Sequence, residues 1–175
     1  SDRYYQGLKM DPLSGIDYVQ SFMMENGSNA MEDRYGFAYG LGIYVSVGHA
    51  NQNNYDSLIL VTNDPTGTWI GRNESQNFGE LKITHWYGNN YGARYIDFND
   101  VHFANNMFVA VAQVDGANSR ASNHNNAYYD EMTIYTSNDG LNWTYRYGPR
   151  GQWGAVTYGN GRWIVVGKSD HSVTS

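Results

Sequence analysis

Two segments of this sequence gather the side chains best suited to recognising a ligand. Residues 72–97 and 113–131 set aromatic rings beside amide, guanidinium and imidazole groups. Flat rings suit the apolar faces of sugars or protein epitopes, while amide and guanidinium groups hydrogen-bond to hydroxyl and carbonyl groups. We expect long loops here, which frequently carry function. The candidate ligand-binding residues are His85, Trp86, Tyr87, Tyr91, Arg94, Arg120, His124 and Tyr128.

A structural interpretation of the same rings has equal weight. Trp86 and the tyrosines would then cap the edges of sheets or pack against a neighbouring subunit, since Tyr and Trp are also enriched where one end of a ring is buried and the other is wet.

Catalytic and metal chemistry find less support in the sequence. The five histidines show none of the close spacings of metal sites, and the chain has no cysteine, so we expect neither a metal nor a cofactor. Asp130 and Glu131 are adjacent, and adjacent residues on a strand point to opposite faces, which makes them a poor acid/base pair. His102 has apolar neighbours and is expected to be a hydrogen-bonded interior residue.

The elements that position these segments are marked by a thirteen-residue pattern, which occurs at residues 36–48, 100–112 and 155–167. In each copy a short apolar strand ends in an aromatic residue, a turn of Gly or Asn follows, and a second strand begins at another aromatic residue. Gly and Asn reach positive φ at low cost, as tight hairpin turns require. The pattern predicts three β-hairpins. Their aromatic pairs are Tyr39 and Tyr44, Phe103 and Phe108, and Tyr158 and Trp163.

Another strand and a distinctive turn follow the first two hairpins. Residues 58–61 lead into a turn with Asp64 and Trp69, and residues 133–136 lead into a turn with Asp139 and Trp143. Each Asp can accept hydrogen bonds from the amides of its own turn, while the Trp ring is buried beneath it. We therefore expect at least three strands per repeat, with a fourth at residues 144–147 of the second.

Residues 137–143, with the sequence Ser-Asn-Asp-Gly-Leu-Asn-Trp, resemble the Asp-box of bacterial neuraminidase repeats, although Gly140 directly follows the Asp. Together with residues 156–167 they look like the repeats of phage tail-fibre and related virion proteins. The resemblance implies an all-β, β-propeller-like fold of about three four-stranded blades with long loop insertions. We interpret the Asp-turns as structural and not as calcium sites, because alternating oxygen ligands are missing. The structural turn residues are Asp64, Trp69, Ser137, Asp139, Gly140 and Trp143.

The repeats are expected near residues 33–72, 97–147 and 152–175 of a single domain spanning residues 1–175. Propellers typically have four or more blades, so three repeats predict a partial ring or one that is completed by oligomerisation. Residues 1–30 are harder to place. We expect residues 16–24 to form a strand that helps to complete a blade.

Composition excludes several classes of protein. Lys and Arg together number 11 against 17 Asp and Glu, a net charge of −6, whereas nucleic acid demands a basic surface. No apolar run approaches the roughly 18 residues that a membrane-spanning helix needs, and no secretory leader is visible. The mean hydropathy of −0.62 suits a loop-rich chain. We expect no nucleic-acid partner and no membrane insertion.

These observations favour a non-enzymatic structural or host-attachment module of a phage or similar virion, displayed extracellularly. Its expected partners are other virion proteins, copies of itself, or a host-surface glycan or protein receptor. A sialidase-like glycoside hydrolase and a secreted lectin are the alternatives. The hydrolase alternative is weaker, because the arginines are scattered without the family's N-terminal arginine motif. The glutamates available to partner a tyrosine lie in turn-like or unplaced sequence, namely Glu25, Glu32, Glu74 and Glu80.

Overall fold

The computed structural model describes residues 4–9, 20–25, 34–49, 59–65, 67–84, 96–114, 133–146 and 152–168. Regular structure in these ranges is entirely β-strand, so the all-β class is confirmed. None of the described ranges forms an apolar helix of membrane-spanning length. The strands are β1 (Tyr4–Lys9), β2 (Gln20–Glu25), β3 (Arg34–Gly40), β4 (Ile43–Gly48), β5 (Ile59–Thr62), β6 (Ser75–Gln76), β7 (Gly79–Glu80), β8 (Lys82–Thr84), β9 (Ile96–Ala104), β10 (Met107–Val114), β11 (Ile134–Ser137), β12 (Asn142–Arg146), β13 (Gln152–Gly159) and β14 (Arg162–Lys168).

The first repeat forms a three-stranded antiparallel sheet of β3, β4 and β5. Leu41 and Gly42 in the β3–β4 turn have positive φ values of 55° and 78°, the left-handed geometry whose twist matches a hairpin. Beyond β5, an antiparallel bridge joins Val61 to Ile70 through two backbone hydrogen bonds of 3.0 and 2.9 Å. This bridge places the chain after the first Asp-turn beside β5.

The second repeat is a four-stranded antiparallel meander of β9, β10, β11 and β12. β8 joins its outer edge and runs parallel to β12, which makes the sheet five-stranded. The central strand β10 is an apolar run buried on both faces, because other strands of the chain pack on both faces of its sheet. Its fully or almost fully buried residues are Phe108, Val109, Ala110, Val111 and Ala112.

The third repeat is described as the two-stranded sheet of β13 and β14. β1 and β2 also pair with each other, as do β6 and β7. All three hairpins predicted from the thirteen-residue pattern are therefore confirmed. In each, the two flanking aromatic residues face one another across the strands, with ring centroids 4.4 Å apart for Tyr39 and Tyr44, 4.6 Å for Phe103 and Phe108, and 5.0 Å for Tyr158 and Trp163.

Each repeat sheet has two different faces. We call the face with the paired aromatic residues the aromatic face, and the opposite face, which carries two aliphatic residues of the second hairpin strand, the aliphatic face. Side chains alternate between these faces because successive residues of a strand point to opposite sides. The aliphatic residues are Val45 and Val47 in the first repeat, Val109 and Val111 in the second, and Ile164 and Val166 in the third.

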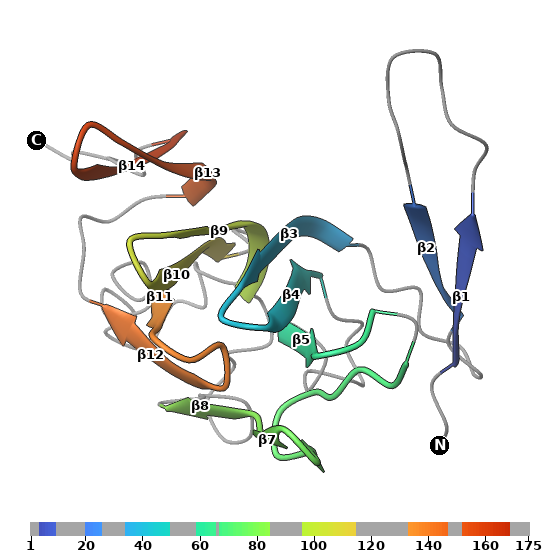
Figure 1. Cartoon of the computed structure of the whole chain (residues 1–175). Coiled ribbons are helices and arrows are strands. Elements are labelled where there is room, and N and C mark those ends of the chain that lie inside the picture. The colour runs from blue at the N-terminus through green and yellow to red at the C-terminus, as the bar shows by residue number, and fades with distance from the viewer. Residues whose placement is uncertain are drawn as a thin grey trace, which may run out of the picture.

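The three repeat sheets stack in chain order, as the succession of β3, β9 and β13 shows in Figure 1. The aliphatic face of the first sheet packs on the aromatic face of the second, so Val45, Val47 and Phe108 share one core. The aliphatic face of the second sheet packs on the aromatic face of the third, so Val109 and Val111 share a second core with Trp163. Both junctions therefore follow the same rule.

Glycine allows the first two sheets to approach closely. A Cβ on Gly36 would lie 2.7 Å from the backbone nitrogen of Val101, and one on Gly40 would lie 2.3 Å from the ring of Phe103. Either contact is far shorter than van der Waals distance, so a side chain at either position would prevent this close approach of β3 and β9.

Two polar side chains connect β9 to β13. The side-chain amide of Asn99 donates to the carbonyl oxygen of Trp153 at 2.7 Å, and the carboxylate of Asp100 accepts from the amide of Val156 at 2.9 Å. Edge groups of β13 thus gain partners from the neighbouring sheet.

Two expectations from the sequence are wrong. Residues 72–97 do not form one long loop, because β6, β7 and β8 lie within them and Leu81 and Ile83 belong to the first core. Apolar Leu81 and Ile83 alternate with polar Lys82 and Thr84, which is the pattern of a half-buried strand. Two of the glutamates expected in turn-like or unplaced sequence lie in strands instead, Glu25 in β2 and Glu80 in β7.

Other expected strands agree with the structure over their described residues. β5 and β11 lie where residues 58–61 and 133–136 predicted strands, and β12 supplies the fourth strand of the second repeat. β2 confirms a strand at residues 20–24, while residues 16–19 lie outside the described residues.

Candidate functional site

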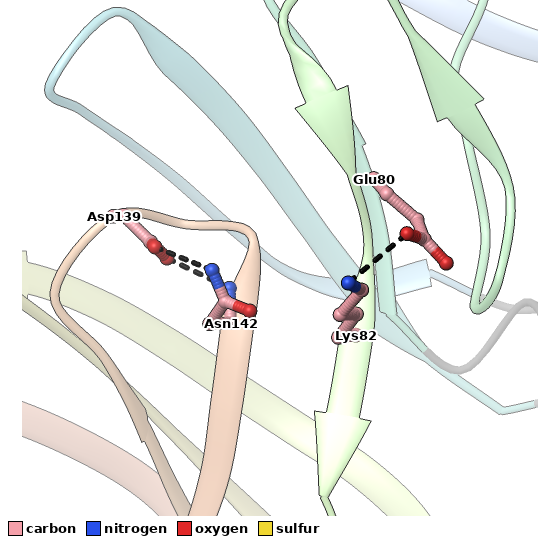
Figure 2. A network of polar contacts seen from close by, with 4 residues as sticks. All are labelled: Glu80, Lys82, Asp139 and Asn142. Atoms are coloured by element: carbon pink, nitrogen blue, oxygen red, sulfur yellow. Dashed lines mark hydrogen bonds and ion pairs between the residues drawn. The ribbon is translucent and has the colours of Figure 1, made fainter.

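The carboxylate of Asp139 is engaged by its own turn. Its Oδ1 accepts hydrogen bonds from the amides of Leu141 and Asn142 at 2.8 and 2.7 Å, and from the Ser137 hydroxyl at 3.0 Å. Its Oδ2 accepts from the side-chain amide of Asn142 at 2.7 Å, a contact visible in Figure 2. The geometry is that of a turn fixed by one acidic side chain.

These contacts also set the ionisation of Asp139. Partial burial raises its pKa, but the hydrogen bonds from the backbone and side chain of Asn142, from Leu141 and from Ser137 outweigh it, so the pKa lies below the ordinary 3.8. Hydrogen bonds to a carboxylate favour its charged form. Asp139 is therefore an ionised structural acceptor at neutral pH.

Trp143 lies beneath the same turn and is fully buried. Its indole Nε1 donates to the carbonyl oxygen of Gly140 at 2.9 Å, and its ring contacts Phe108 with centroids 6.0 Å apart. Gly140 has a φ of +76°, and a Cβ there would lie 2.9 Å from the side chain of Ile43. The turn thus closes over the junction between the first two repeat sheets.

The turn of the first repeat uses a hydroxyl group in the corresponding place. Thr62 Oγ1 accepts a hydrogen bond from the amide of Asp64 at 3.1 Å and lies 2.8 and 2.9 Å from the carbonyl oxygens of Asp64 and Thr68. Trp69 is 3% exposed, and its Nε1 donates to the carbonyl oxygen of Pro65 at 3.4 Å. Both turns therefore combine a hydroxyl-bearing residue at the strand end with a buried Trp.

β8 runs beside the second Asp-turn, as Figure 2 shows. The amide of Lys82 donates to the carbonyl oxygen of Leu141 at 2.8 Å, and Thr84 Oγ1 donates to the carbonyl oxygen of Trp143 at 2.9 Å. Lys82 Nζ lies 3.1 Å from the Glu80 carboxylate, and both side chains are largely exposed. An ion pair this exposed contributes little to stability.

Both predicted binding segments leave the five-stranded sheet at one end. The register pairs Val114, where β10 ends, with Ile96, where β9 begins. It also pairs Ile134, where β11 begins, with Arg146, where β12 ends. The segment at residues 115–132 therefore departs and returns at this end, which we call the insertion-bearing end.

The segment at residues 85–95 is attached at the same place. It follows Thr84, the last residue of β8, which pairs with Thr144 near the end of β12. It returns at Ile96, the first residue of β9. The tight hairpin turn at Asn105 and Asn106 lies at the opposite end of this sheet. The fold thus attaches both candidate segments to a single end.

The three-stranded sheet contributes to the insertion-bearing end through His49. This residue follows β4, and its Nδ1 forms an ion-pair contact with the carboxylate of Asp97 at the start of β9. The His49 side chain is 45% exposed and that of Asp97 is 13% exposed. An imidazole and a carboxylate therefore meet at solvent where two repeat sheets adjoin.

The eight candidate ligand-binding residues lie outside the described residues. They are His85, Trp86, Tyr87, Tyr91, Arg94, Arg120, His124 and Tyr128. Among the described residues, no group of three His, Asp or Glu side chains is placed to hold a metal ion. His102 is half-buried and packs edge-on against Trp163, with ring centroids 5.9 Å apart.

Sequence reasoning missed four polar residues at or between the repeat sheets, and one signal was available for them. One follows β4, and the other three lie within the first five residues of β9, the strand that follows residues 85–95. Polar residues that flank an apolar strand often satisfy backbone groups of a neighbouring element. These residues are His49, Asp97, Asn99 and Asp100.

No family model, curated protein or solved structure matches this chain.

Proposed function

We propose that this chain is a non-enzymatic β-propeller-type module of a phage or similar virion, with a structural or host-attachment role. The observation that carries the proposal is the uniform stacking rule, in which an aliphatic face meets an aromatic face at both junctions. Repeats that bury each other's faces in series form a rigid platform. The blades of a propeller are arranged in this way around an axis.

The insertion-bearing end supports the attachment role. Residues 85–95 and 115–132 hold all of the candidate aromatic, Arg and His residues, and their attachment points share one end of the sheet. Loops on a rigid scaffold are a common way to present a binding surface. The ligand chemistry that fits this composition is a host-surface glycan or a protein epitope rich in hydroxyl and carbonyl groups.

The Asp-turns favour this role over catalysis. Asp139 gives both carboxylate oxygens to its own turn, and its lowered pKa makes it a poor proton donor at neutral pH. A sialidase-like enzyme and a lectin would also bind glycans. Binding and turnover must therefore be measured separately.

The test is binding of the chain to a glycan array and to candidate host cells, with mass spectrometry of the glycans after incubation. We expect retention without cleavage, and at least tenfold weaker retention for Trp86→Ala or Tyr128→Ala. Leu41→Asn at the β3–β4 turn is the matched control, because an exposed turn residue at the opposite end should not affect binding. Glycan cleavage would establish the hydrolase alternative, and full retention by both variants would contradict binding by these segments.

A further inference from the structure

Two faces of the stack remain exposed, and they are complementary in kind. The aromatic face of the first repeat sheet presents Phe37 and Tyr39, which are 52% and 55% exposed. The aliphatic face of the third presents Ile164 and Val166, which are 50% and 56% exposed. Contiguous exposed apolar side chains on a folded protein mark interaction sites.

The buried residues at equivalent repeat positions show what such faces pack against. Ile164 corresponds to Val45 and Val109, and Val166 corresponds to Val47 and Val111. These four valines are at most 3% exposed. Those four valines lie against an aromatic face in both junctions within the chain. The aliphatic face of β13–β14 therefore has the composition of a face that normally lies beneath aromatic rings.

The exposed aromatic face likewise matches buried ones. Tyr39 and Tyr44 occupy the positions of Phe103 and Phe108, whose rings join the core between the first two sheets. Phe37 contacts both Tyr44 and Trp69, with ring centroids 5.9 and 6.1 Å apart, so the rings form a continuous layer. At both junctions within the chain, an aromatic face of this kind packs against an aliphatic face.

Gly159 gives an independent indication of the missing neighbour. Its repeat equivalent, Gly40, has no room for a side chain because the Phe103 ring would lie 2.3 Å from a Cβ. A Cβ on Gly159 would meet nothing within 4 Å. The equivalent residue at the second junction is Ala104, so both junctions within the chain have a small residue at this position, and Gly159 leaves the same room for the ring of a further sheet.

We propose that the aliphatic face of β13–β14 in one copy of this chain packs on the aromatic face of β3–β4–β5 in a second copy. The interface is head to tail, and it repeats the junction that already joins consecutive sheets within the chain. A heterologous contact of this kind generates a ring when the rotation closes and an open filament when it does not. The inference rests on the stacking of the sheets and is independent of glycan or receptor binding.

The test uses two variants of the full chain, each blocked at one face. Phe37→Glu with Tyr39→Glu blocks the aromatic face, and Gly159→Leu blocks the aliphatic face. Gly159→Leu leaves the monomer intact, because the site is open and Gly159 has no positive φ. Circular dichroism and thermal melting verify folding, and Leu41→Asn again serves as the exposed control.

Mass in solution, measured by light scattering or sedimentation over a range of concentrations, decides the outcome. We expect the wild type to exceed the 19.8 kDa of one chain and each blocked variant to remain at 19.8 kDa. An equimolar mixture of the two variants should form a pair of twice that mass, since each retains one intact face. A monomeric wild type, self-association of either blocked variant, or failure of the mixture to pair would overturn the proposal.

Failure of this test is distinguishable from failure of the proposed function. Mass measurements report on the exposed faces, whereas retention on glycans or host cells reports on the segments at the insertion-bearing end. A monomer that binds its ligand would overturn only the self-association.

Discussion

Asp100 on β9 accepts two backbone hydrogen bonds. Its Oδ2 accepts from the amide of Val156 on β13 at 2.9 Å, and its Oδ1 accepts from the amide of Val101 at 2.9 Å. One carboxylate thus joins its own strand to the neighbouring repeat sheet. The equivalent residues of the other repeats are Gly36 and Ala155, so the contact distinguishes the second junction from the first.

Replacing Asp100 by Ala should destabilise the fold by about 1.5–3 kcal/mol, because two amides lose a charged acceptor. Asp100→Asn should cost less, since it keeps one carbonyl oxygen. Urea unfolding followed by tryptophan fluorescence measures the difference. Equal stabilities for Asp100→Ala and the wild type would show that the contact contributes nothing to the junction.

Gly40 and Gly159 occupy the same repeat position and should respond in opposite ways to substitution by Ala. Gly40→Ala drives a methyl group into the Phe103 ring, and overpacking of this kind costs about 1–3 kcal/mol or more. Gly159→Ala meets open space in one chain and should raise stability by about 0.4–1 kcal/mol, because it reduces the freedom of the unfolded chain. Chemical unfolding of both variants at a concentration where the chain is monomeric checks this contrast.

Asp139 should make the stability of the fold depend on pH in the acid range. Its folded-state pKa lies below the ordinary 3.8, so its contribution is fully present well above that value and is lost as the pH falls through the folded pKa. Asp139→Asn should therefore be less stable than the wild type at neutral pH, with a difference that shrinks on acidification. Urea midpoints of both proteins measured from neutral to acid pH test this, and a constant difference would contradict it.

The hairpins were predictable because their information is local. Positive-φ turn residues and flanking aromatic rings lie within thirteen residues of one another, and Asn105, Asn106 and Asn160 adopt the expected left-handed geometry. The Asp139 turn is equally local, since its hydrogen bonds span at most three residues. Local chemistry of this kind needs no knowledge of tertiary packing.

The parts that were missed depend on distant partners. β8 pairs with β12, about sixty residues later in the chain, and nothing near Lys82 specifies that partner. The contacts of Asn99 and Asp100 likewise span more than fifty residues. The length of residues 72–97 between two repeats suggested a loop, whereas burial of Leu81 and Ile83 in a core built by other repeats makes part of it a strand.

Trp143 and Trp153 offer a final matched pair, because their indole nitrogens differ in hydrogen bonding. Nε1 of Trp143 donates to the carbonyl oxygen of Gly140, a buried residue. Nε1 of Trp153 is buried and finds no hydrogen-bond partner among the described residues. Trp143→Phe should cost about 1–3 kcal/mol, because the carbonyl oxygen of Gly140 loses its donor.

Trp153→Phe should cost distinctly less, because it removes a donor that was buried without compensation. Trp143→Ala sets the scale, since deleting a fully buried ring costs about 3–5 kcal/mol. Thermal and urea unfolding of the three variants give the order of stabilities, with near-ultraviolet circular dichroism to verify native packing. A larger loss for Trp153→Phe than for Trp143→Phe would mean that the Trp143 hydrogen bond does not hold the Asp139 turn.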